Sequence, residues 1–267
     1  MPELAEVEFF RKQWDCGLKQ RVLSVDLHAS KRIFRGTETK QLQQTITGAT
    51  LLESKAHGKQ MLFRFSKDAW LGLHLGMTGK LRVEKPGFTP EKHDHLVLQQ
   101  KKHSLVFRDP RLFGRVLFHI GKDEPAWWSK RATDLLSKEF TAEFLEKLLQ
   151  RHRKAPLKAV LLMQHRFPGV GNWMADEILW QTKLNPKMAA GDVSPTLAKK
   201  LHKQIQFICA EALRIIGHDF SDPPESWLFQ HRWRKGGHCP RCESSLKHAT
   251  VGGRTTCWCP KCQPVVE

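Results

Sequence analysis

Four cysteines near the end of the chain constrain its fold more than any other feature. They form two Cys-x-x-Cys pairs, Cys239–Cys242 and Cys259–Cys262, with sixteen residues between the pairs. Two such pairs at this spacing supply four thiolates for one tetrahedral Zn²⁺ ion, with a hairpin between them. A closed site of four thiolates leaves no coordination position for a substrate. We therefore predict one structural zinc ion, with Cys239, Cys242, Cys259 and Cys262 as its ligands.

The other three cysteines fall outside this spacing. Cys16 and Cys209 lie in apolar-periodic segments, where buried thiols are expected, and Cys257 is expected to be a free thiol. Cysteines that crowd together in a reducing compartment indicate metal binding more often than disulfides.

The first residues, Met1-Pro2-Glu3-Leu4-Ala5-Glu6, allow two interpretations. If Met1 is removed, Pro2 presents a free secondary amine, and a larger fraction of an α-amino group than of a lysine is unprotonated at neutral pH. Such an amine can attack an aldehyde-like carbon and form a covalent iminium. Alternatively, Pro2 and the acids simply open a helix. The small residue at position 2 favours removal of Met1, and a retained Met1 would silence the amine in a peptide bond.

The charge of the chain indicates its class of partner. Lys and Arg total 44 against 27 Asp and Glu, a formal net charge of +17. This excess favours a polyanion, with nucleic acid ahead of an acidic membrane surface. The sequence lacks a run of about 18 apolar residues and a basic, apolar leader. We expect an intracellular protein, cytoplasmic or nucleoid-associated, with no membrane partner.

The periodicity divides the chain. Residues 3–18 predict an amphipathic helix that ends near Gly17. Eight short apolar or alternating runs follow up to residue 120 and predict antiparallel strands of a sandwich or barrel-like sheet. Residues 121–128 interrupt the pattern like a linker. The pattern is helical from about 131 to 217, in the runs at 140–150, 157–164, 172–183 and 197–216.

Two segments of the helical part could bind phosphate. Residues 168–172 (PGVGN) precede a helix, where free N–H groups and the helix dipole attract an anion and Asn172 would cap the helix. A tight helical corner with structural glycines explains the segment equally well. A basic cluster of Arg151, Arg153, Lys154 and Lys158 either extends a phosphate-binding groove or is a solvated helix end.

Seven segments together resemble one family. They are PELAEVE at the N-terminus, HGK at 57–59, HLGMTG at 74–79, KHDH at 92–95, DPRLFG at 109–114, GVGNWMADE at 169–177 and GRTTCWCPKCQ at 253–263. In this order they resemble the formamidopyrimidine-DNA glycosylase / endonuclease VIII family, on its formamidopyrimidine branch. The resemblance implies an α+β protein with an N-terminal antiparallel β-sandwich, a helix–two-turn–helix domain and a C-terminal zinc-finger hairpin. We expect these domains at residues 1–125, 126–225 and 226–267.

The resemblance also implies the site residues. Pro2 would be the nucleophile that attacks C1′ of a nucleotide whose base is flipped out, and Glu3 the general acid/base. Lys59 would contact phosphate and assist β-elimination, and Arg254 would hold a phosphate and assist δ-elimination. Glu6 would be an acid near the site with a positioning role. Met77, Arg111 and Phe113 would fill the void left by the flipped base. The remaining implied DNA contacts are His74, His93, Arg153 and Asn172.

The sequence thus predicts a bifunctional DNA glycosylase and AP lyase that repairs oxidised purines in damaged double-stranded DNA as a monomer. Ala5 departs from the family's usual proline, and residues 218–235 are short where bacterial members of this branch carry a longer loop over 8-oxoguanine. We therefore expect formamidopyrimidines and hydantoins ahead of 8-oxoguanine. The alternatives are an oxidised-pyrimidine glycosylase of the same family and a catalytically silent binder of damaged DNA.

Overall fold

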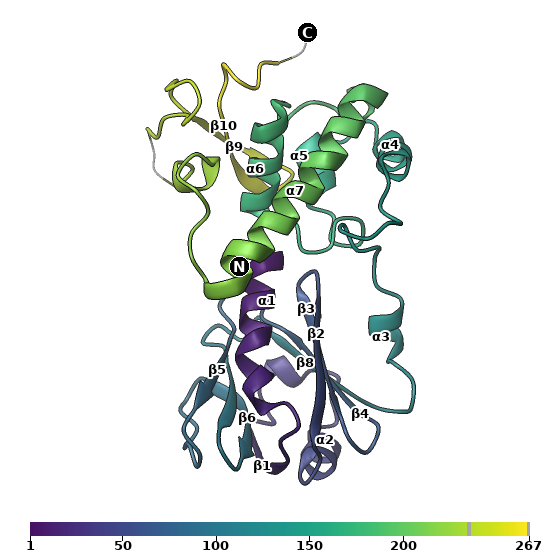
Figure 1. Ribbon diagram of the computed structural model, residues 1–267, viewed down its shortest axis with the longest axis vertical. Coiled ribbons are helices and arrows are strands. Elements are labelled where there is room, and N and C mark those ends of the chain that lie inside the picture. The colour runs from purple at the N-terminus through teal and green to yellow at the C-terminus, as the bar shows by residue number, and fades with distance from the viewer. Residues whose placement is uncertain (234–235, 266–267) are drawn as a thin grey trace. The chain divides into compact units, whose positions relative to one another are not determined.

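The computed structural model describes residues 1–233 and 236–265. The chain packs into two compact units. The first contains Met1–Pro2 and Glu6–Arg131, and the second contains Glu3–Ala5 and the chain from Ala132 onward. The predicted α+β class is confirmed, whereas the boundaries of the three expected domains stay a prediction. Figure 1 shows both units and labels most of their helices and strands.

The predicted N-terminal helix is present, and from Glu6 onward it belongs to the first unit. α1 (Leu4–Gln13) continues as a 3-10 turn over Trp14–Gly17. Trp14 and Gly17 are buried in this turn, but Cys16 lies on its outer side and is exposed, so the prediction of a buried Cys16 was wrong. The prediction also missed α2 (Thr39–Ile46), whose polar sequence buries only Leu42 and Ile46.

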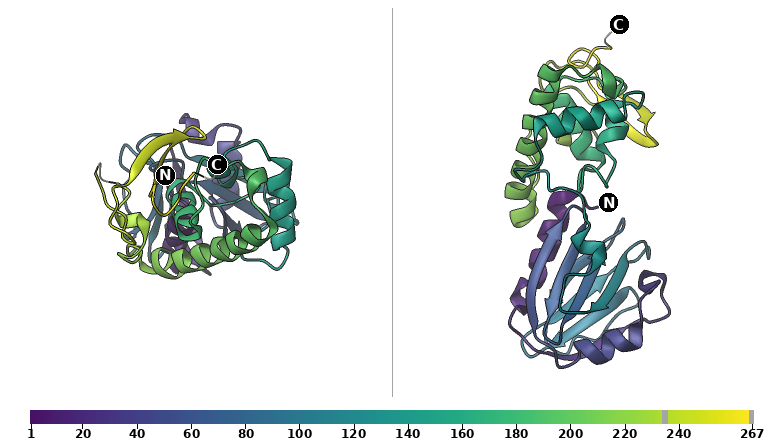
Figure 2. Two further views of the ribbon diagram at one scale, coloured as in Figure 1. Left: turned by 90° about the horizontal axis from the view of Figure 1, so that it is seen from above. Right: turned by 90° about the vertical axis from the view of Figure 1, so that its right-hand side faces the viewer.

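All eight predicted strands are present, in two antiparallel sheets of four. One sheet has the order β1-β6-β7-β5 and the other β2-β3-β4-β8. Their bounds are β1 (Val22–Leu27), β2 (Leu51–His57), β3 (Gln60–Phe65), β4 (Ala69–His74), β5 (Lys80–Glu84), β6 (Asp94–Gln100), β7 (Ser104–Arg108) and β8 (Arg115–Ile120). Figure 2 shows the strands of the two sheets as neighbouring layers.

One apolar cluster joins the two sheets into a sandwich. It includes Val25 and Leu98 from the first sheet, Phe63 and Leu71 from the second, and Trp14 from the turn after α1. Because side chains alternate between the faces of a strand, each sheet keeps a second face outside this core. On the second sheet that outer face carries Leu62, Trp70 and Trp128. Trp128 belongs to α3 (Ala126–Ser129), a short helix where the sequence indicated only a linker.

The second unit is built around helix α6 (Asn172–Thr182), which is buried along most of its length. Helices α5 (Leu157–Leu161) and α7 (Pro195–Asp219) pack against α6, and α4 (Ala142–Arg151) packs against α7. The sequence sets the start of α7, because Ser194 accepts a hydrogen bond from Leu197 N and Pro195 occupies the first turn. α5 is shorter than its predicted range of 157–164.

The predicted hairpin between the cysteine pairs consists of β9 (Lys247–Val251) and β10 (Arg254–Trp258). Gly252 and Gly253 join them, both with positive φ (59° and 73°), as two-residue hairpin turns of type I′ require. No helix in the described parts of the chain has the length and apolar character needed to span a membrane.

Candidate active site and nucleic-acid interface

The Glu3 carboxylate is fixed at the N-terminus of α6. Its oxygens accept hydrogen bonds from the backbone N–H groups of Gly171 (3.0 Å), Trp173 (3.0 Å) and Met174 (3.1 Å). Glu3 is only 3% exposed. A Cβ at position 171 would lie 2.1 Å from the Glu3 carboxyl carbon, so only glycine allows this approach. Three N–H donors and the positive end of a helix dipole favour a charged carboxylate here.

This arrangement corrects the prediction of a phosphate cradle at residues 168–172. The anion that these N–H groups hold is Glu3 of the same chain. Asn172 does not cap the helix, because the N-cap residue is Gly171. The Asn172 side chain instead donates from Nδ2 to the Thr255 carbonyl at 2.9 Å, directly beside Arg254 in strand β10. Asn172 therefore connects α6 to the strand that begins with Arg254.

A buried ion network holds the same strand. Lys158 Nζ lies 2.5 Å from Asp176 Oδ1, and Arg232 Nη2 lies 2.5 Å from Asp176 Oδ2. Lys158 also donates to the Thr255 carbonyl (3.2 Å), and Cys257 N donates to Asp176 (3.2 Å). Burial lowers the pKa of Lys158, and the attraction of Asp176 opposes this shift.

Lys158 therefore does not belong to the predicted exposed basic cluster. Its side chain is fully buried, whereas Arg151, Arg153 and Lys154 are exposed. Lys158 was grouped with these residues because it lies close to them in the sequence, and closeness in the sequence does not indicate burial. Sequence reasoning also missed Asp176 and Arg232, since nothing in the spacing of these three residues indicates that they meet.

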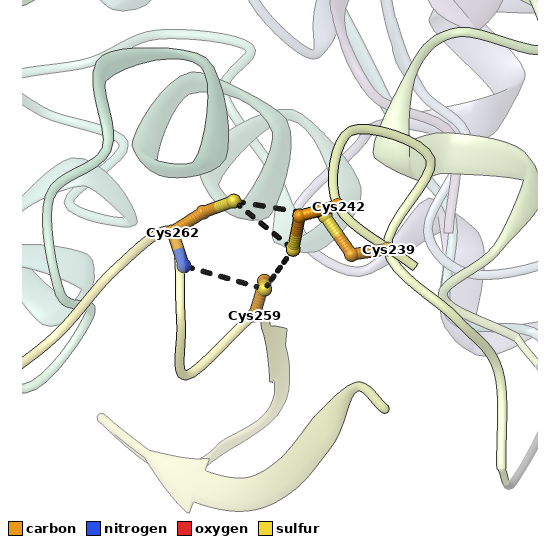
Figure 3. Close-up of side chains that lie close together, drawn as sticks. All are labelled: Cys239, Cys242, Cys259 and Cys262. Atoms are coloured by element: carbon orange, nitrogen blue, oxygen red, sulfur yellow. Dashed lines mark hydrogen bonds between the residues drawn. The ribbon is translucent and has the colours of Figure 1, made fainter. Parts of the chain in front are cut away.

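The four predicted metal ligands converge (Figure 3). The Sγ atoms of Cys239, Cys242, Cys259 and Cys262 all lie within 4.8 Å of one another. The Cys242 Sγ lies 3.5 Å from those of Cys259 and Cys262, and the Cys239 Sγ lies 3.9 Å from that of Cys262. A tetrahedral ion with metal–sulfur bonds of about 2.3 Å requires sulfur atoms roughly 3.8 Å apart. The four cysteines thus fit a metal ion. Cys257 is outside this group and buried, and burial raises its pKa to about 12.

Two motif loops of the first unit pack against each other. The buried Asp109 carboxylate accepts hydrogen bonds from Thr78 Oγ1 (2.9 Å), Arg111 N (3.3 Å) and Gly114 N (2.7 Å). Gly76 has a φ of 63°, and a Cβ there would lie 2.4 Å from the Phe113 carbonyl carbon. The segments 74–79 and 109–114 are therefore one structural element.

This element presents the three residues predicted to fill the void in DNA. Met77 is 41% exposed and Phe113 is 42% exposed, unusually high values for large apolar side chains. The Arg111 guanidinium lies over the Phe113 ring, 4.8 Å from its centroid. Exposed apolar side chains beside an unburied guanidinium suit insertion into a base stack.

Lys59 and His74 also belong to the first unit. Lys59 lies in the turn between β2 and β3 and is 8% exposed. His74 Nδ1 accepts a hydrogen bond from Gly76 N at 3.0 Å, which leaves Nε2 as the donor of the neutral ring. Burial lowers the pKa of His74, and the charges of Lys59 and Arg35 lower it further. The ring can therefore donate to a phosphate oxygen without carrying charge.

The remaining predicted residues are spread over both units. Pro2, Glu6 and His93 lie in the first unit and are partly exposed. Arg153 follows α4 and is exposed, and Arg254 is exposed at the start of β10 in the second unit. Within the second unit, Glu3 accepts hydrogen bonds at the N-terminus of α6. Asn172, the first residue of α6, contacts the strand that begins with Arg254. The assigned roles of all these residues stay predictions.

Comparison with known proteins then identifies the family. Residues 1–116 match the formamidopyrimidine-DNA glycosylase N-terminal domain, and residues 132–222 match the formamidopyrimidine-DNA glycosylase H2TH domain. The chain belongs to the formamidopyrimidine-DNA glycosylase family. This confirms the resemblance that the seven sequence segments indicated. Members of the family are DNA glycosylases with AP lyase activity, so the predicted class of bifunctional enzyme is confirmed at the level of the family.

Individual relatives match over almost their whole length. The formamidopyrimidine-DNA glycosylase of Xanthomonas campestris pv. campestris is 34% identical over 277 residues, covering 98% of this chain and all of the relative. That of Acinetobacter baumannii is 32% identical over 273 residues, covering 99% and 98%.

Solved structures agree. Lactococcus lactis Fpg bound to DNA that contains an oxidised pyrimidine has a TM-score of 0.88 at 28% identity, covering 99% of this chain and all of that one. A variant of the same enzyme bound to DNA that contains Fapy-dG has a TM-score of 0.87 at 29% identity, with the same coverage.

Proposed function

We propose that this protein excises oxidised purines from double-stranded DNA and then cleaves the strand, with Pro2 as the nucleophile. The observation that carries the proposal is the fixed Glu3 carboxylate, which is bonded to Pro2 in the chain and held by three N–H groups. Formamidopyrimidines and hydantoins are the proposed substrates, ahead of 8-oxoguanine. DNA is the proposed partner, the proposed state is a monomer, and the proposed location is cytoplasmic or nucleoid-associated.

The first step requires a free Pro2 amine and therefore a chain without Met1. The amine nitrogen attacks C1′ of the damaged nucleotide, and the bond from C1′ to the base breaks. The proton lost by the amine passes through the Glu3 carboxylate to the leaving base. Because the hydrogen bonds around Glu3 favour its charged form, Glu3 acts first as a base and then as an acid.

The following steps cleave the strand. The C1′–O4′ bond of the sugar then breaks, O4′ takes a proton from water, and the Pro2 nitrogen forms an iminium with C1′. The positively charged iminium acidifies the C2′ proton, and removal of this proton expels the 3′ phosphate by β-elimination. A second, δ-elimination releases the 5′ phosphate. Lys59 and Arg254 would stabilise the phosphate charges in these steps, as cations positioned at a developing negative charge do. The proposed zinc ion, held by Cys239, Cys242, Cys259 and Cys262, would fold the hairpin of Arg254 and take no part in the reaction.

Borohydride reduction tests the nucleophile. Reduction of the iminium should give a covalent protein–DNA adduct with duplex that contains a lesion or an abasic site, and Pro2→Gly should give much less. Mass spectrometry of the N-terminus establishes in the same sample that Met1 is absent. If processed wild-type protein binds the duplex but forms no adduct, the protein is the catalytically silent binder.

Glu3→Gln tests the proton transfer. The variant keeps an oxygen that can accept from the α6 N–H groups but loses the proton shuttle, so single-turnover base excision should fall by about 10²- to 10⁴-fold. Cleavage of a duplex with a preformed abasic site should fall less. Equal losses on both substrates would contradict a role in departure of the base.

Arg254→Ala tests whether Arg254 acts in δ-elimination, after the base has been removed. Loss of this exposed cation should reduce δ-elimination or DNA affinity more than iminium formation, and Arg254→Lys should restore part of the loss. An unchanged ratio of β- to δ-products at unchanged affinity would remove Arg254 from the proposed mechanism.

A second substrate class has specific support. A Lactococcus lactis relative has been solved with DNA that contains an oxidised pyrimidine. A panel of duplexes with formamidopyrimidine, hydantoin, 8-oxoguanine and oxidised-pyrimidine lesions, compared under single-turnover conditions, decides the order. Faster excision of the pyrimidines would replace the proposed purine preference.

A further inference from the structure

The outer face of the sheet β2-β3-β4-β8 carries a polar row that the proposed mechanism does not explain. The strand register places Gln60 opposite His74, and His74 opposite Arg115. Directly opposite residues in antiparallel strands have neighbouring side chains on the same face. An amide, an imidazole and a guanidinium therefore lie side by side at one end of this face.

The next row on the same face is apolar, with a glycine at its centre. Gly72 pairs with Leu62 on one side and with Leu117 on the other. The Trp127 ring of α3 covers Gly72, and a Cβ at this position would lie 2.4 Å from Trp127 Cη2. Any residue larger than glycine would displace the ring. Trp127 also packs at an angle of 82° against the buried Trp128, with centroids 6.5 Å apart. Its ring is thus a fixed, half-exposed wall beside the polar row.

Two arginines, Arg35 and Arg115, lie at the polar end of this face. Both line a pocket over this face, and neither forms an ion pair with a carboxylate of the described residues. Arg35 is held in place, since its Nη1 donates to the Gly114 carbonyl at 2.9 Å. Burial lowers the pKa of Arg35, and the charges of Arg115 and Arg32 lower it further. The fold keeps like charges together where a bound anion would relieve their repulsion.

These elements enclose one pocket of about 280 Å³. Its wall at one end is the Trp127 ring, and its polar end holds two guanidinium groups with Gln60 and His74 beside them. A flat aromatic wall suits the face of a nucleobase, and paired guanidinium groups suit a phosphate. A simple anion would leave Trp127 without a role, and an apolar ligand would leave the two arginines without one.

We propose that this pocket binds one nucleotide of a DNA strand, with its base against Trp127 and its phosphate on Arg35 and Arg115. The inference rests on DNA as the partner under the proposed function. The pocket includes His74 and Phe113, which are themselves proposed DNA contacts, so a strand that meets those residues reaches the pocket. The same chemistry would also accept a free nucleoside monophosphate, and the experiment separates the two sources.

Fluorine NMR of protein labelled with 5-fluorotryptophan reports on the pocket directly. Trp127→Phe assigns the Trp127 resonance by its disappearance. Undamaged duplex DNA with a single-stranded overhang, a free deoxynucleoside monophosphate and inorganic phosphate are then titrated separately into the full-length protein. We expect duplex DNA to shift the Trp127 resonance saturably, and inorganic phosphate alone to leave it in place.

Arg115→Gln tests the phosphate end. It should reduce the slope of log affinity for duplex DNA against log salt by about one, since one phosphate contact is lost. Arg115→Lys should keep the slope. The matched control is Lys101→Gln, which removes an exposed positive charge from the turn between β6 and β7 and should leave the slope unchanged. Trp127→Leu should weaken duplex binding by about tenfold through lost stacking.

The outcomes separate this inference from the proposed function. A Trp127 resonance that moves with the free nucleotide but not with duplex keeps the nucleotide pocket and assigns it a free ligand. A resonance that moves with neither overturns the inference, even where wild-type protein forms the borohydride adduct. A slope that falls equally in Arg115→Gln and Lys101→Gln also overturns the phosphate contact. Absence of the adduct concerns only the proposed function.

Discussion

Two buried aspartates, one in each unit, hold the segments that carry predicted DNA-binding arginines, and they are satisfied in different ways. Asp109 fixes the loop of Arg111, and its donors among the described residues are neutral: two backbone N–H groups and the Thr78 hydroxyl. Asp176 fixes the strand of Arg254 and lies between two cations, Lys158 and Arg232. Both carboxylates are at most 1% exposed.

The difference lies in where the partners come from. The donors to Asp109 include residues two and five positions further along its own loop. The partners of Asp176 come from α5 and from residue 232, and its backbone donor comes from β10. The loop of Arg111 is therefore set mainly by local chain geometry, whereas the strand of Arg254 depends on distant segments and on buried charge.

Metal removal should separate the two regions most strongly. A chelator that strips the four cysteines should unfold the hairpin β9–β10, because metal binding and folding of such sites are coupled. Hydrogen exchange should then show loss of protection in 247–258 and continued protection in the strands around Asp109. Elemental analysis should give one zinc per chain beforehand. Equal loss of protection in both units would contradict the local role of the metal.

Asp176→Asn should have the next largest effect. It leaves Lys158 and Arg232 as two buried cations without their anion, and breaking a buried ion pair costs about 3–5 kcal/mol. The free energy of unfolding of the second unit, measured by hydrogen exchange in denaturant, should fall by this amount. Asp222→Asn, at an exposed position, is the control. A loss no larger than the control would show that the network does not stabilise the strand.

The pH dependence of stability should have opposite signs in the two units. Burial raises the pKa of Glu177 to about 7, against the hydrogen bonds from Gln181 and Phe229 N. The folded second unit then binds this proton more tightly than the unfolded chain, so its stability falls as the pH rises from about 4.5 to 7. In the first unit, burial lowers the pKa values of His74 and His95. The unfolded chain therefore binds these protons more tightly than the folded unit, so the first unit loses stability as the pH falls below about 6.5.

Glu177→Gln isolates the contribution of the second unit. The variant cannot ionise, so the fall in stability of roughly 2–3 kcal/mol between pH 4.5 and 7 should disappear from the second unit. Hydrogen exchange at several pH values measures it. Glu225→Gln at an exposed site should keep the wild-type slope. An unchanged slope in Glu177→Gln would assign the pH dependence to other groups.

Asp109→Asn should have the smallest effect of the series. The amide oxygen can still accept from Thr78 and Arg111, but its NH₂ group would face the Gly114 N–H, which lies 2.7 Å from the carboxylate. One unsatisfied buried group costs about 1–3 kcal/mol. The loss should appear in hydrogen exchange of segment 109–114, with Asp68→Asn as the exposed control. A cost equal to that of Asp176→Asn would remove the distinction between neutral and charged partners.

This contrast also explains what the sequence could predict. The eight strands, the hairpin and the four converging cysteines follow from local alternation, turn residues and spacing. For the glycine-rich corner at 168–172 the sequence left open a phosphate site at a helix N-terminus or a tight structural corner, and the structure shows a carboxylate there. The anion proved to be Glu3, a residue 168 positions away from Gly171, and no local pattern announces such a pairing.

Other features could not be predicted for related reasons. From the sequence, Lys158 is indistinguishable from an exposed basic residue, because the residues of its buried ion network, Asp176 and Arg232, are distant in the chain. Helix α2 buries only two apolar side chains, too few for a clear period. The tryptophans at 127 and 128 looked like part of a linker, because their partners lie on a sheet face more than fifty residues earlier in the chain.

The tip of the β9–β10 hairpin has a consequence for mutational scanning. Gly252 has a φ of 59°, and a Cβ there would lie 2.8 Å from Ala159 Cβ and 3.0 Å from Ala159 Cα. A substitution at Gly252, two residues before Arg254, would thus disturb both the turn and its contact with α5. A scan that scores only activity would rank position 252 among the functional residues, although its side-chain hydrogen faces the protein. A Cβ at Gly253 would lie more than 4 Å from every described residue apart from its two chain neighbours, so comparing the two glycines separates tight packing from turn geometry.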